Sequence, residues 1–283
     1  MIHNNDEPKI TIITVCYNAI QNIESTILSV ISQTYKNVEY IVIDGNSNDG
    51  TIDIIKKYSN SIDKWVSEPD KGIYDAMNKG IKMASGDWLN FMNAGDVFYS
   101  NDTIENIVED FTDAAIVYGY VIRDLGRKSF SAHGITCSSP KIIDFINSSF
   151  QHQACFIDKR MFDQYGGYST ELRLAADSKF FFDVVAINHE KTKYINMPIA
   201  IFNMDGASTR NAAVYKEERE LFLRQYLGNE IYDNLYELHL YRSIAAVRGL
   251  FVFLAFTNSL PIVISVKKRL RELKNIIKNF IIK

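Results

Sequence analysis

Acidic side chains stand where apolar stretches of the chain end, and the first of them is Asp44. It closes a β-branched stretch and opens the segment Asp-Gly-Asn-Ser-Asn-Asp-Gly-Thr. Its carboxylate can accept hydrogen bonds from a base or a ribose, and the glycines would let a ligand approach the backbone. The structural alternative is a polar turn in which Asp49 or Thr51 caps a helix. The segment is neither a GxGxxG nor a Walker loop, so it implies neither a nicotinamide cofactor nor ATP.

Two further segments place a carboxylate after an apolar stretch. Asp70, Lys71 and Gly72 offer an acid, a cation and bare backbone at the start of a helical pattern, although Asp70 could simply cap that helix. In the segment from Asn93 to Asp96, the acid could hold a hard divalent cation that bridges a diphosphate. Such a cation would offset the charge that grows on a departing nucleotide diphosphate. A plain β-turn closed by Asp96 is the alternative.

A histidine and a third acid follow later in the chain. His152 stands between two glutamines ahead of an apolar stretch, where a lone histidine is usually structural. The segment from Arg173 to Asp177 places an acid at the start of a helix, a position that the helix dipole favours. A catalytic role for Asp177 is the competing interpretation.

The elements that must position these side chains follow from hydrophobic periodicity. Strands are predicted over 9–16, 38–44, 62–67 and 87–92, with helical patterns over 23–31, 51–58 and 73–81 between them. This alternation predicts an α/β fold with an open, mostly parallel sheet covered by helices. Ligands bind such sheets at the carboxyl ends of the strands, so the polar segments there should converge on one edge.

The pattern changes after about residue 110. A strand pair is predicted over 114–123 and 128–133 around Leu125 and Gly126, then a helix over 140–147, a strand over 153–157, a helix over 177–187 and a strand over 194–203. From Val214 onward the chain is predicted to be mainly helical.

Taken together, the motifs resemble family 2 glycosyltransferases, which are inverting enzymes with the GT-A fold. The segments that carry the resemblance are 12–18, 39–51, 67–80 and 89–96, followed by 152–154 and 175–177. The resemblance covers roughly residues 8–210 and looks closest to bacterial enzymes that build surface polysaccharides such as O-antigen, lipopolysaccharide, capsule or exopolysaccharide. It implies a GT-A domain over 1–210, with a donor half over about 8–110 and an acceptor half over about 111–210.

The resemblance also implies a role for each motif residue. Asp177 would be the general base, Asp96 the metal ligand, and His152 and Arg173 would lie near the acceptor or the diphosphate. The donor, most simply a UDP-linked sugar, would contact Tyr17, Asn18, Asp44, Asn46, Asp70, Lys71 and Asn93. The family commonly has two or three acids at its DxD element, whereas this chain keeps Asp96 alone. Mn²⁺ or Mg²⁺ would therefore rely on donor phosphates for its remaining ligands.

Composition and charge restrict the possible binding partners of the chain. The net charge is −3, yet residues 242–283 hold nine Lys or Arg and a single acid, Glu272. A basic, amphipathic helical extension over 211–283 suits an anionic membrane surface, and a lipid-linked saccharide acceptor would fit that place. A helix packed on the main domain is the alternative. The basic cluster lacks base-stacking aromatics, so nucleic-acid binding is not expected.

The expected location is the cytosolic face of the inner membrane. Three cysteines at wide spacings give no disulfide framework, and no signal peptide is visible.

Two competing functions stay open at this point. One is a sugar nucleotidyltransferase, which would need a basic glycine loop after the first strand. The other is an inactive sugar-nucleotide-binding or scaffold protein, which the thinned acidic motif allows.

Overall fold

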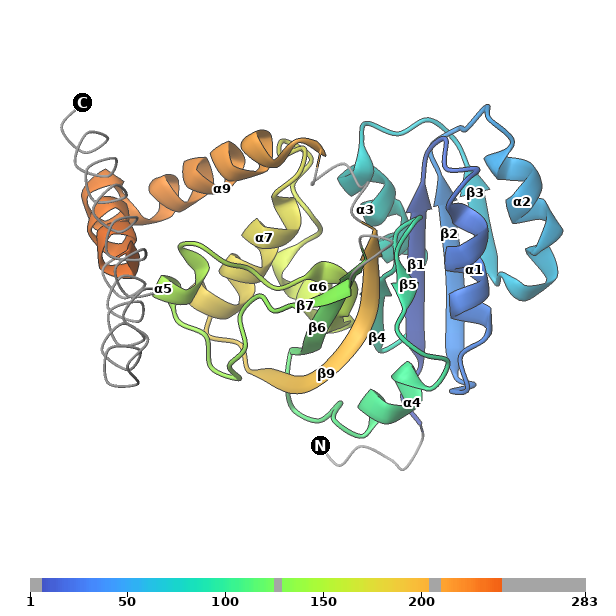
Figure 1. Cartoon of the computed structure of the whole chain (residues 1–283), viewed down its shortest axis with the longest axis horizontal. Coiled ribbons are helices and arrows are strands. Elements are labelled where there is room, and N and C mark those ends of the chain that lie inside the picture. The colour runs from blue at the N-terminus through green and yellow to red at the C-terminus, as the bar shows by residue number, and fades with distance from the viewer. Residues whose placement is uncertain (1–6, 125–128, 204–209, 241–283) are drawn as a thin grey trace, which may run out of the picture. The chain divides into compact units, whose positions relative to one another are not determined.

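The computed structural model describes residues 7–124, 129–203 and 210–240. Its described residues form a nine-stranded sheet around which the helices are arranged (Figure 1). The strands follow the order β3 (Lys64–Ser67), β2 (Val38–Asp44), β1 (Ile10–Cys16), β4 (Trp88–Phe91), β8 (Cys155–Asp158), β6 (Ile116–Asp124), β9 (Thr192–Asn203) and β5 (Val97–Phe98), with β7 (Ser129–Ala132) paired to β6. The first four strands are parallel, which confirms the predicted fold class.

The central strands form because their sequences can be buried on both faces. Every residue of β1 is buried, and β2 is buried from its second residue to its last. Continuous β-branched stretches of this kind are typical of parallel strands covered by helices. Strand ends are also aligned, since Cys16 pairs with Asp44 and Asp44 with Ser67. The predicted convergence of polar segments on one edge of the sheet is thereby confirmed.

The helices of the first half are α1 (Ile23–Ile31), α2 (Thr51–Lys57), α3 (Ile73–Met83) and α4 (Thr103–Val108). The close packing of α3 on β1 depends on a glycine. A Cβ atom at Gly80 would lie 2.5 Å from the side chain of Ile13, so a larger residue would push the helix away. The helix begins after Gly72, whose φ of 123° is a conformation that side-chain-bearing residues rarely adopt. This packing fixes the position of Tyr74 in the first turn of α3.

The second half contains α5 (Ile142–Phe145), η2 (His152–Ala154), α6 (Lys159–Tyr165), α7 (Ala176–Phe181), the π-helix η3 (Phe182–Ile187) and α9 (Ala212–Leu227). The strand predicted over 153–157 begins only at Cys155, because the chain first makes a 3₁₀ turn in which Ala154 donates to the Gln151 carbonyl. The prediction over 177–187 holds for helix, but its second part is a π-helix. Short elements β5, α4 and α6 were not predicted, and the turn at residues 125–126 lies outside the described residues.

Backbone contacts divide the chain after Gly228, so that α9 belongs to the first unit together with the sheet. Residues 229–240 of the second unit are helical. In the part of the chain that the structure describes, no helix has the length and apolar character needed to cross a bilayer. The domain boundary predicted at residue 210 stays a prediction, and residues 241–283, which carry most of the predicted basic extension, lie outside the described residues.

Candidate active site

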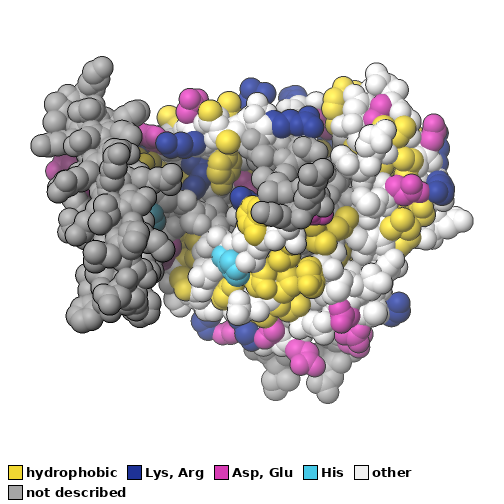
Figure 2. Space-filling view, viewed as in Figure 1, with side chains coloured by type: hydrophobic (Ala, Val, Ile, Leu, Met, Phe, Trp, Pro, Cys, Tyr) yellow, Lys and Arg dark blue, Asp and Glu magenta, His cyan; other side chains and the backbone are white. Residues whose placement is uncertain are grey.

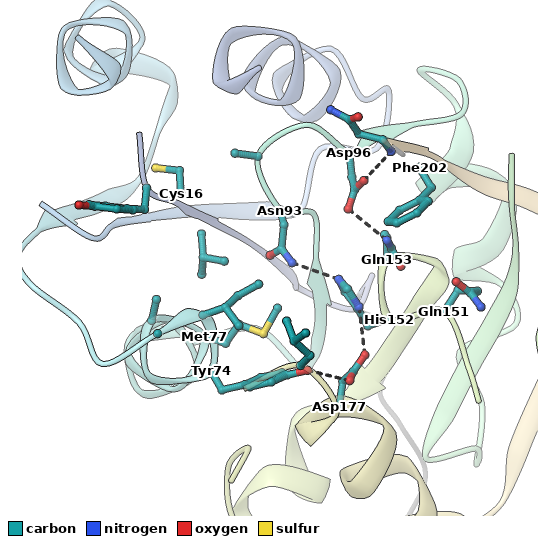
Figure 3. A pocket seen from close by; sticks show the side chains of 18 of the residues that line it. Cys16, Tyr74, Met77, Asn93, Asp96, Gln151, His152, Gln153, Asp177 and Phe202 are labelled. Carbon is teal, nitrogen blue, oxygen red and sulfur yellow. Dashed lines mark hydrogen bonds and ion pairs between the residues drawn. The ribbon is translucent and has the colours of Figure 1, made fainter. Parts of the chain in front are cut away.

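A cleft of about 690 Å³ opens at the carboxyl edge of the sheet and is lined by most of the predicted site residues. One side consists of the ends of β1 and β4 and the start of α3, and the other of η2, α7, β9 and α9 (Figure 3). Its polar lining is formed by Tyr17, Asp70, Tyr74, Asn93, Asp96, Arg123, Gln151, His152, Gln153, Asp177, Asn203 and Tyr215. On the face shown in Figure 2, the described surface carries both basic and acidic side chains.

The carboxylate of Asp177 is held from both sides. Its Oδ1 accepts a hydrogen bond from the Tyr74 hydroxyl at 2.8 Å and another from the Ser178 N–H at 2.8 Å. Its Oδ2 lies 3.2 Å from Nδ1 of His152 (Figure 3). Three elements that are far apart in sequence, α3, η2 and α7, therefore meet at one carboxylate.

The neighbours of His152 determine its tautomer. The Asn93 amide nitrogen lies 3.1 Å from Nε2, so in the neutral imidazole Nε2 carries the lone pair and accepts from this amide. Nδ1 must then carry the proton and donate it to Asp177. The side-chain oxygen of Asn93 is buried and has no partner among the described residues, so it is available to a hydrogen-bond donor on a ligand.

The electrostatics of this pair favour an ionised Asp177. Burial alone would raise the pKa of Asp177, but the hydrogen bond and charge of His152, together with the donors from Tyr74 and Ser178, hold it below its ordinary value. For His152, burial lowers the pKa, and the hydrogen bond and charge of Asp177 outweigh that effect and raise it. The pair therefore combines a carboxylate that stays charged with an imidazole whose orientation is fixed.

The loop that precedes Asp177 is held by helix α9. Oε1 of Glu218 accepts the N–H of Arg173 at 2.8 Å, and Oε2 accepts the N–H groups of Leu174 and Ala175 at 2.9 and 3.0 Å. One carboxylate thus satisfies three successive backbone donors at the start of α7, where no side chain of the helix itself provides a cap. Glu218 thereby positions the turn from which Asp177 enters the cleft.

Asp96 lies on the opposite wall, in the loop after β4. Its Oδ2 accepts from the Gln153 amide at 3.1 Å and its Oδ1 from the Asn203 N–H at 3.0 Å. Burial raises the pKa of Asp96 to about 6, against the lowering effects of the His152 charge and these two hydrogen bonds. Burial thus favours the neutral form of Asp96, and a neighbouring positive charge would favour the ionised form.

The far end of the cleft can accommodate a planar ring beside a carboxylate. Tyr17 follows β1 and is 64% exposed, so its ring is available for stacking. Asp70 lies against the turn after β2, because a Cβ atom at Gly45 would meet its Oδ2 at 2.5 Å. Oδ1 of Asp70 accepts the Gly72 N–H at 2.8 Å, which fixes the side chain at this end.

Comparison with known proteins gives the class of this site. The sequence profile of Glycosyl transferase family 2 matches residues 11–166, which is more than half of the chain. The chain belongs to glycosyltransferase family 2. The chain is therefore a glycosyltransferase, and the family match spans the strand ends that form the cleft and both of the segments that hold Asp96 and His152.

Two relatives show the range of similarity within the family. An uncharacterized glycosyltransferase of Mycobacterium tuberculosis is 33% identical over 177 residues, which are 61% of this chain and 67% of that protein. A glycosyltransferase of PGL/p-HBAD biosynthesis from Mycobacterium bovis is 28% identical over 216 residues, which are 74% of this chain and 82% of that protein.

Solved structures share the fold at low sequence identity. Staphylococcus aureus TarS 1–349 in complex with UDP-GlcNAc matches with a TM-score of 0.63 and 17% identity, covering 78% of this chain and 67% of that one. The mannosyltransferase PcManGT from Pyrobaculum calidifontis, in complex with GDP-Man and Mn²⁺, matches with a TM-score of 0.56 and 16% identity, covering 86% and 76%. The match extends over 43% of the longer TarS chain. At these identities the likeness concerns the fold of this family 2 chain.

The structure places part of the predicted donor set away from the cleft lining. Asp44 is fully buried, and its carboxylate accepts from the Ser47 N–H at 2.9 Å, the Ser47 hydroxyl at 2.5 Å and the Ser67 hydroxyl at 2.6 Å. It thus closes the turn that supports Gly45. Asn46 is exposed on that turn with a φ of 67°, and Asn18 binds the same turn through the Asn48 N–H. Their donor contacts stay predictions.

Lys71 and Arg173 are exposed and are also absent from the cleft lining. The backbone N–H of Lys71 binds Asp75, and that of Arg173 binds Glu218. The structure therefore brings together Tyr17, Asp70, Asn93, Asp96, His152 and Asp177 from the predicted set.

Several cleft residues were given no role from the sequence. Tyr74 and Gln153 lie inside the motif segments, so their neighbours Gly72 and His152 were the available signal. Phe202, Arg123 and Tyr215 come from β9, β6 and α9, and no motif marks them. They reach the cleft because long-range pairing brings these elements to it, which a local sequence pattern does not encode.

The donor atoms of the cleft fit a cation that is held together with a phosphate ligand. No group of three or more His, Cys, Asp or Glu capable of holding a metal exists among residues 7–124, 129–203 and 210–240. Asp96 is the acid of the segment that resembles the metal-binding element, and burial raises its pKa to about 6, so a neighbouring cation would favour its ionised form. A hard divalent cation takes six or more oxygen ligands, so diphosphate oxygens and water would supply the rest.

Proposed function

We propose that this chain is an inverting glycosyltransferase that moves a sugar from a nucleoside diphosphate, UDP in the first instance, to a hydroxyl of a saccharide or lipid-linked saccharide acceptor in cell-surface glycan synthesis. The observation that carries the proposal is the shared cleft: Tyr17 and Asp70 lie at one end, Asp96 on one wall and Asp177 on the other. The names of the relatives and the nucleotide sugars held by the solved neighbours support it.

In this proposal the nucleoside occupies the end with Tyr17 and Asp70, and the diphosphate lies toward Asp96. Tyr17 offers a face for the base, and Asp70 offers acceptor oxygens for base or ribose. A divalent cation held by Asp96 and the diphosphate would offset the negative charge that develops on the leaving group. The unpartnered oxygen of Asn93 is placed to accept a hydroxyl hydrogen of the sugar in the same cleft.

The proposed step is a single displacement in which atoms and charges balance. Asp177 takes the proton of the acceptor hydroxyl while that oxygen bonds to the anomeric carbon, and the bond to the diphosphate breaks with its electron pair on phosphate. Attack from the side of Asp177 and departure toward Asp96 invert the anomeric centre. The transition state has oxocarbenium character, as in other glycosyl transfers. His152 and Tyr74 keep the carboxylate oriented and ionised until it takes the proton.

The test is a thermal-shift panel of UDP-, GDP- and dTDP-sugars with and without Mn²⁺, followed by donor hydrolysis measured without acceptor. We expect one nucleotide class to raise Tm, with a larger increase when Mn²⁺ is present. Slow release of the nucleoside diphosphate would show turnover. Binding without any release would identify the chain as an inactive sugar-nucleotide-binding protein, and no Tm increase with any donor would refute the proposal.

We further propose that the basic segment 242–283 holds the enzyme at the cytosolic face of an anionic membrane. Its nine Lys or Arg residues against one acid support this, because each basic residue near an anionic surface adds about 1 kcal/mol. The full chain should sediment with vesicles that contain phosphatidylglycerol and stay in solution with phosphatidylcholine vesicles. Exchange of Lys267, Lys268, Arg269 and Arg271 for glutamine should abolish sedimentation, and unchanged sedimentation would refute the electrostatic attachment.

A further inference from the structure

The cleft lining has an imbalance of charge that the proposed reaction must overcome. Three aspartates line it, Asp70, Asp96 and Asp177, and Arg123 is the single Lys or Arg among the described lining residues. A nucleoside diphosphate brings further negative charge into this space. Arg123 therefore supplies a fixed positive charge that the sequence motifs did not reveal.

The surroundings of Arg123 leave its guanidinium group available to a ligand. Among the described residues no carboxylate forms an ion pair with it, and its Nε is buried without a hydrogen-bond partner. Since a buried donor without a partner is costly, most such groups in folded proteins are paired. The Nε of Arg219 is likewise buried without a partner, but its terminal nitrogen donates to the carbonyls of Phe145 and Ser148 at 2.6 Å each, as expected of an arginine that holds the fold together.

The sheet fixes where Arg123 points. In the register of β6, Arg123 pairs with Phe130 of β7 on one side and with Phe202 of β9 on the other, so the three side chains share one face. The guanidinium carbon lies 5.9 Å from the centre of the Phe202 ring. Phe202 itself lies beside Asp96 and Gln153 in the cleft (Figure 3). A guanidinium stacked on an aromatic ring keeps the edge of its planar fork free for hydrogen bonds.

We propose that Arg123 binds a phosphate group inside the cleft through this fork. The inference rests on the proposed function, since it assumes that the cleft takes a nucleotide sugar. Guanidinium and phosphate match in bidentate geometry, which favours a phosphate over a neutral sugar hydroxyl as the partner. The phosphate comes either from the diphosphate of the donor or from a phosphorylated acceptor bound next to it, and one set of titrations separates the two sources.

The experiment titrates UDP and UMP, each with Mn²⁺, into the full chain and into R123Q and R123K by calorimetry. If the donor is the source, R123Q weakens UDP binding about tenfold to hundredfold and UMP binding much less. R123K keeps the charge but loses the fork, so its loss should be intermediate. R224Q is the matched control, because Arg224 lies on α9, pairs with Glu220 and is absent from the cleft lining.

A second titration adds methyl phosphate to protein already saturated with UDP and Mn²⁺. If a phosphorylated acceptor is the source, UDP affinity is the same in all variants, whereas methyl phosphate binds the original chain and R224Q but not R123Q. The inference is overturned if R123Q and R123K match the original chain in both titrations. Failure of the proposed function has a different signature, namely an original chain that binds no nucleoside diphosphate at all.

Discussion

The sharpest test of the site is the exchange of Asp177 for asparagine. In the present structure Oδ1 receives two donors, from Tyr74 and Ser178, and Oδ2 receives the proton of His152 Nδ1. An asparagine can keep its oxygen toward Tyr74 and Ser178, but its amide nitrogen then faces Nδ1, which is also a donor. The substitution is tolerated only if the neighbouring groups rearrange their hydrogen bonds.

The network has one such rearrangement available. His152 can move its proton to Nε2, so that Nδ1 accepts from the new amide, and the Asn93 side chain can turn its amide to accept from Nε2. The Asn93 oxygen has no partner among the described residues at present, so this rotation sacrifices no bond to them except the one that it replaces. The donors of His152 and of the new amide are then satisfied, whereas the amide nitrogen of Asn93 moves to a buried place where the oxygen had no partner among the described residues. We therefore expect the free energy of unfolding of Asp177→Asn to fall by about 1–3 kcal/mol, the cost of a buried donor without a partner, with the chain still folded.

The effect on transfer should be far larger, because an amide cannot accept the proton of the acceptor hydroxyl. A positioned general base contributes about 10²- to 10⁴-fold, so kcat should fall by that factor while the Kd of the donor stays within about twofold. Stopped assays of acceptor glycosylation and calorimetry of donor binding measure the two quantities. Asp163→Asn is the matched control, since Asp163 pairs with Lys159 on the surface of α6. A kcat within threefold of the unaltered chain, or an unfolded variant, would refute this reasoning.

Three further predictions follow from the contacts around the site and the sheet. Because the Tyr74 hydroxyl helps to lower the pKa of Asp177, Tyr74→Phe should let that pKa rise and move the acid limb of the kcat/KM–pH profile to higher pH; an unmoved limb would contradict this. Glu218→Ala leaves three backbone donors without their carboxylate. It should lower the free energy of unfolding, measured in urea, by about 2–3 kcal/mol and lower kcat more than donor affinity. Glu220→Ala on the same helix is the control and should lower the free energy of unfolding by less than about 1 kcal/mol. Glu39 is buried, which alone would raise its pKa, yet hydrogen bonds from Lys64, Ser85 and Thr11 lower the pKa from 4.5 to about 2. Its stabilising effect of about 3 kcal/mol is therefore complete above pH 4.5 and lost as pH falls toward 2, so Glu39→Gln should flatten acid unfolding in that window and leave transfer unchanged.

The donor half of the fold could be predicted because its information is local. The stretches that form β1 and β2 consist mainly of apolar and β-branched residues, and a polar residue closes β2 and follows the end of β1. Parallel pairing then brings these ends to one edge, as the register of Cys16, Asp44 and Ser67 shows. What local patterns could not fix was the direction of each side chain at that edge. The Asp44 carboxylate is bound by Ser47 of its own turn and by Ser67, and at this end of the cleft Asp70 is the carboxylate in the lining.

The second wall of the cleft depends on contacts that no short pattern contains. Residues 211–283 were predicted as a helical C-terminal extension, and within this range α9 contributes Tyr215 to the cleft and Glu218 to the turn before Asp177. The contacts of Glu218 span more than 40 residues, and the only buried residues of α9 are Arg219, Phe222 and Leu223. Its sequence therefore looks like a surface helix, although its few buried residues determine where the second wall lies.

The geometry around Asn93 also bears on the segment from Asn93 to Asp96, in which Asp96 is the single acid. The shortage of acids there left an inactive binding protein as an alternative function. A carboxylate at position 93 would face Nε2 of His152, and two acceptors would oppose each other unless the imidazole became charged. The amide instead donates to Nε2 and so forces the Nδ1 proton toward Asp177. An amide at this position thus serves the orientation of the proposed base. The loss of an acid at position 93 is consistent with a working site in which Asp96 alone meets the cation, and erosion of function is not needed to explain it.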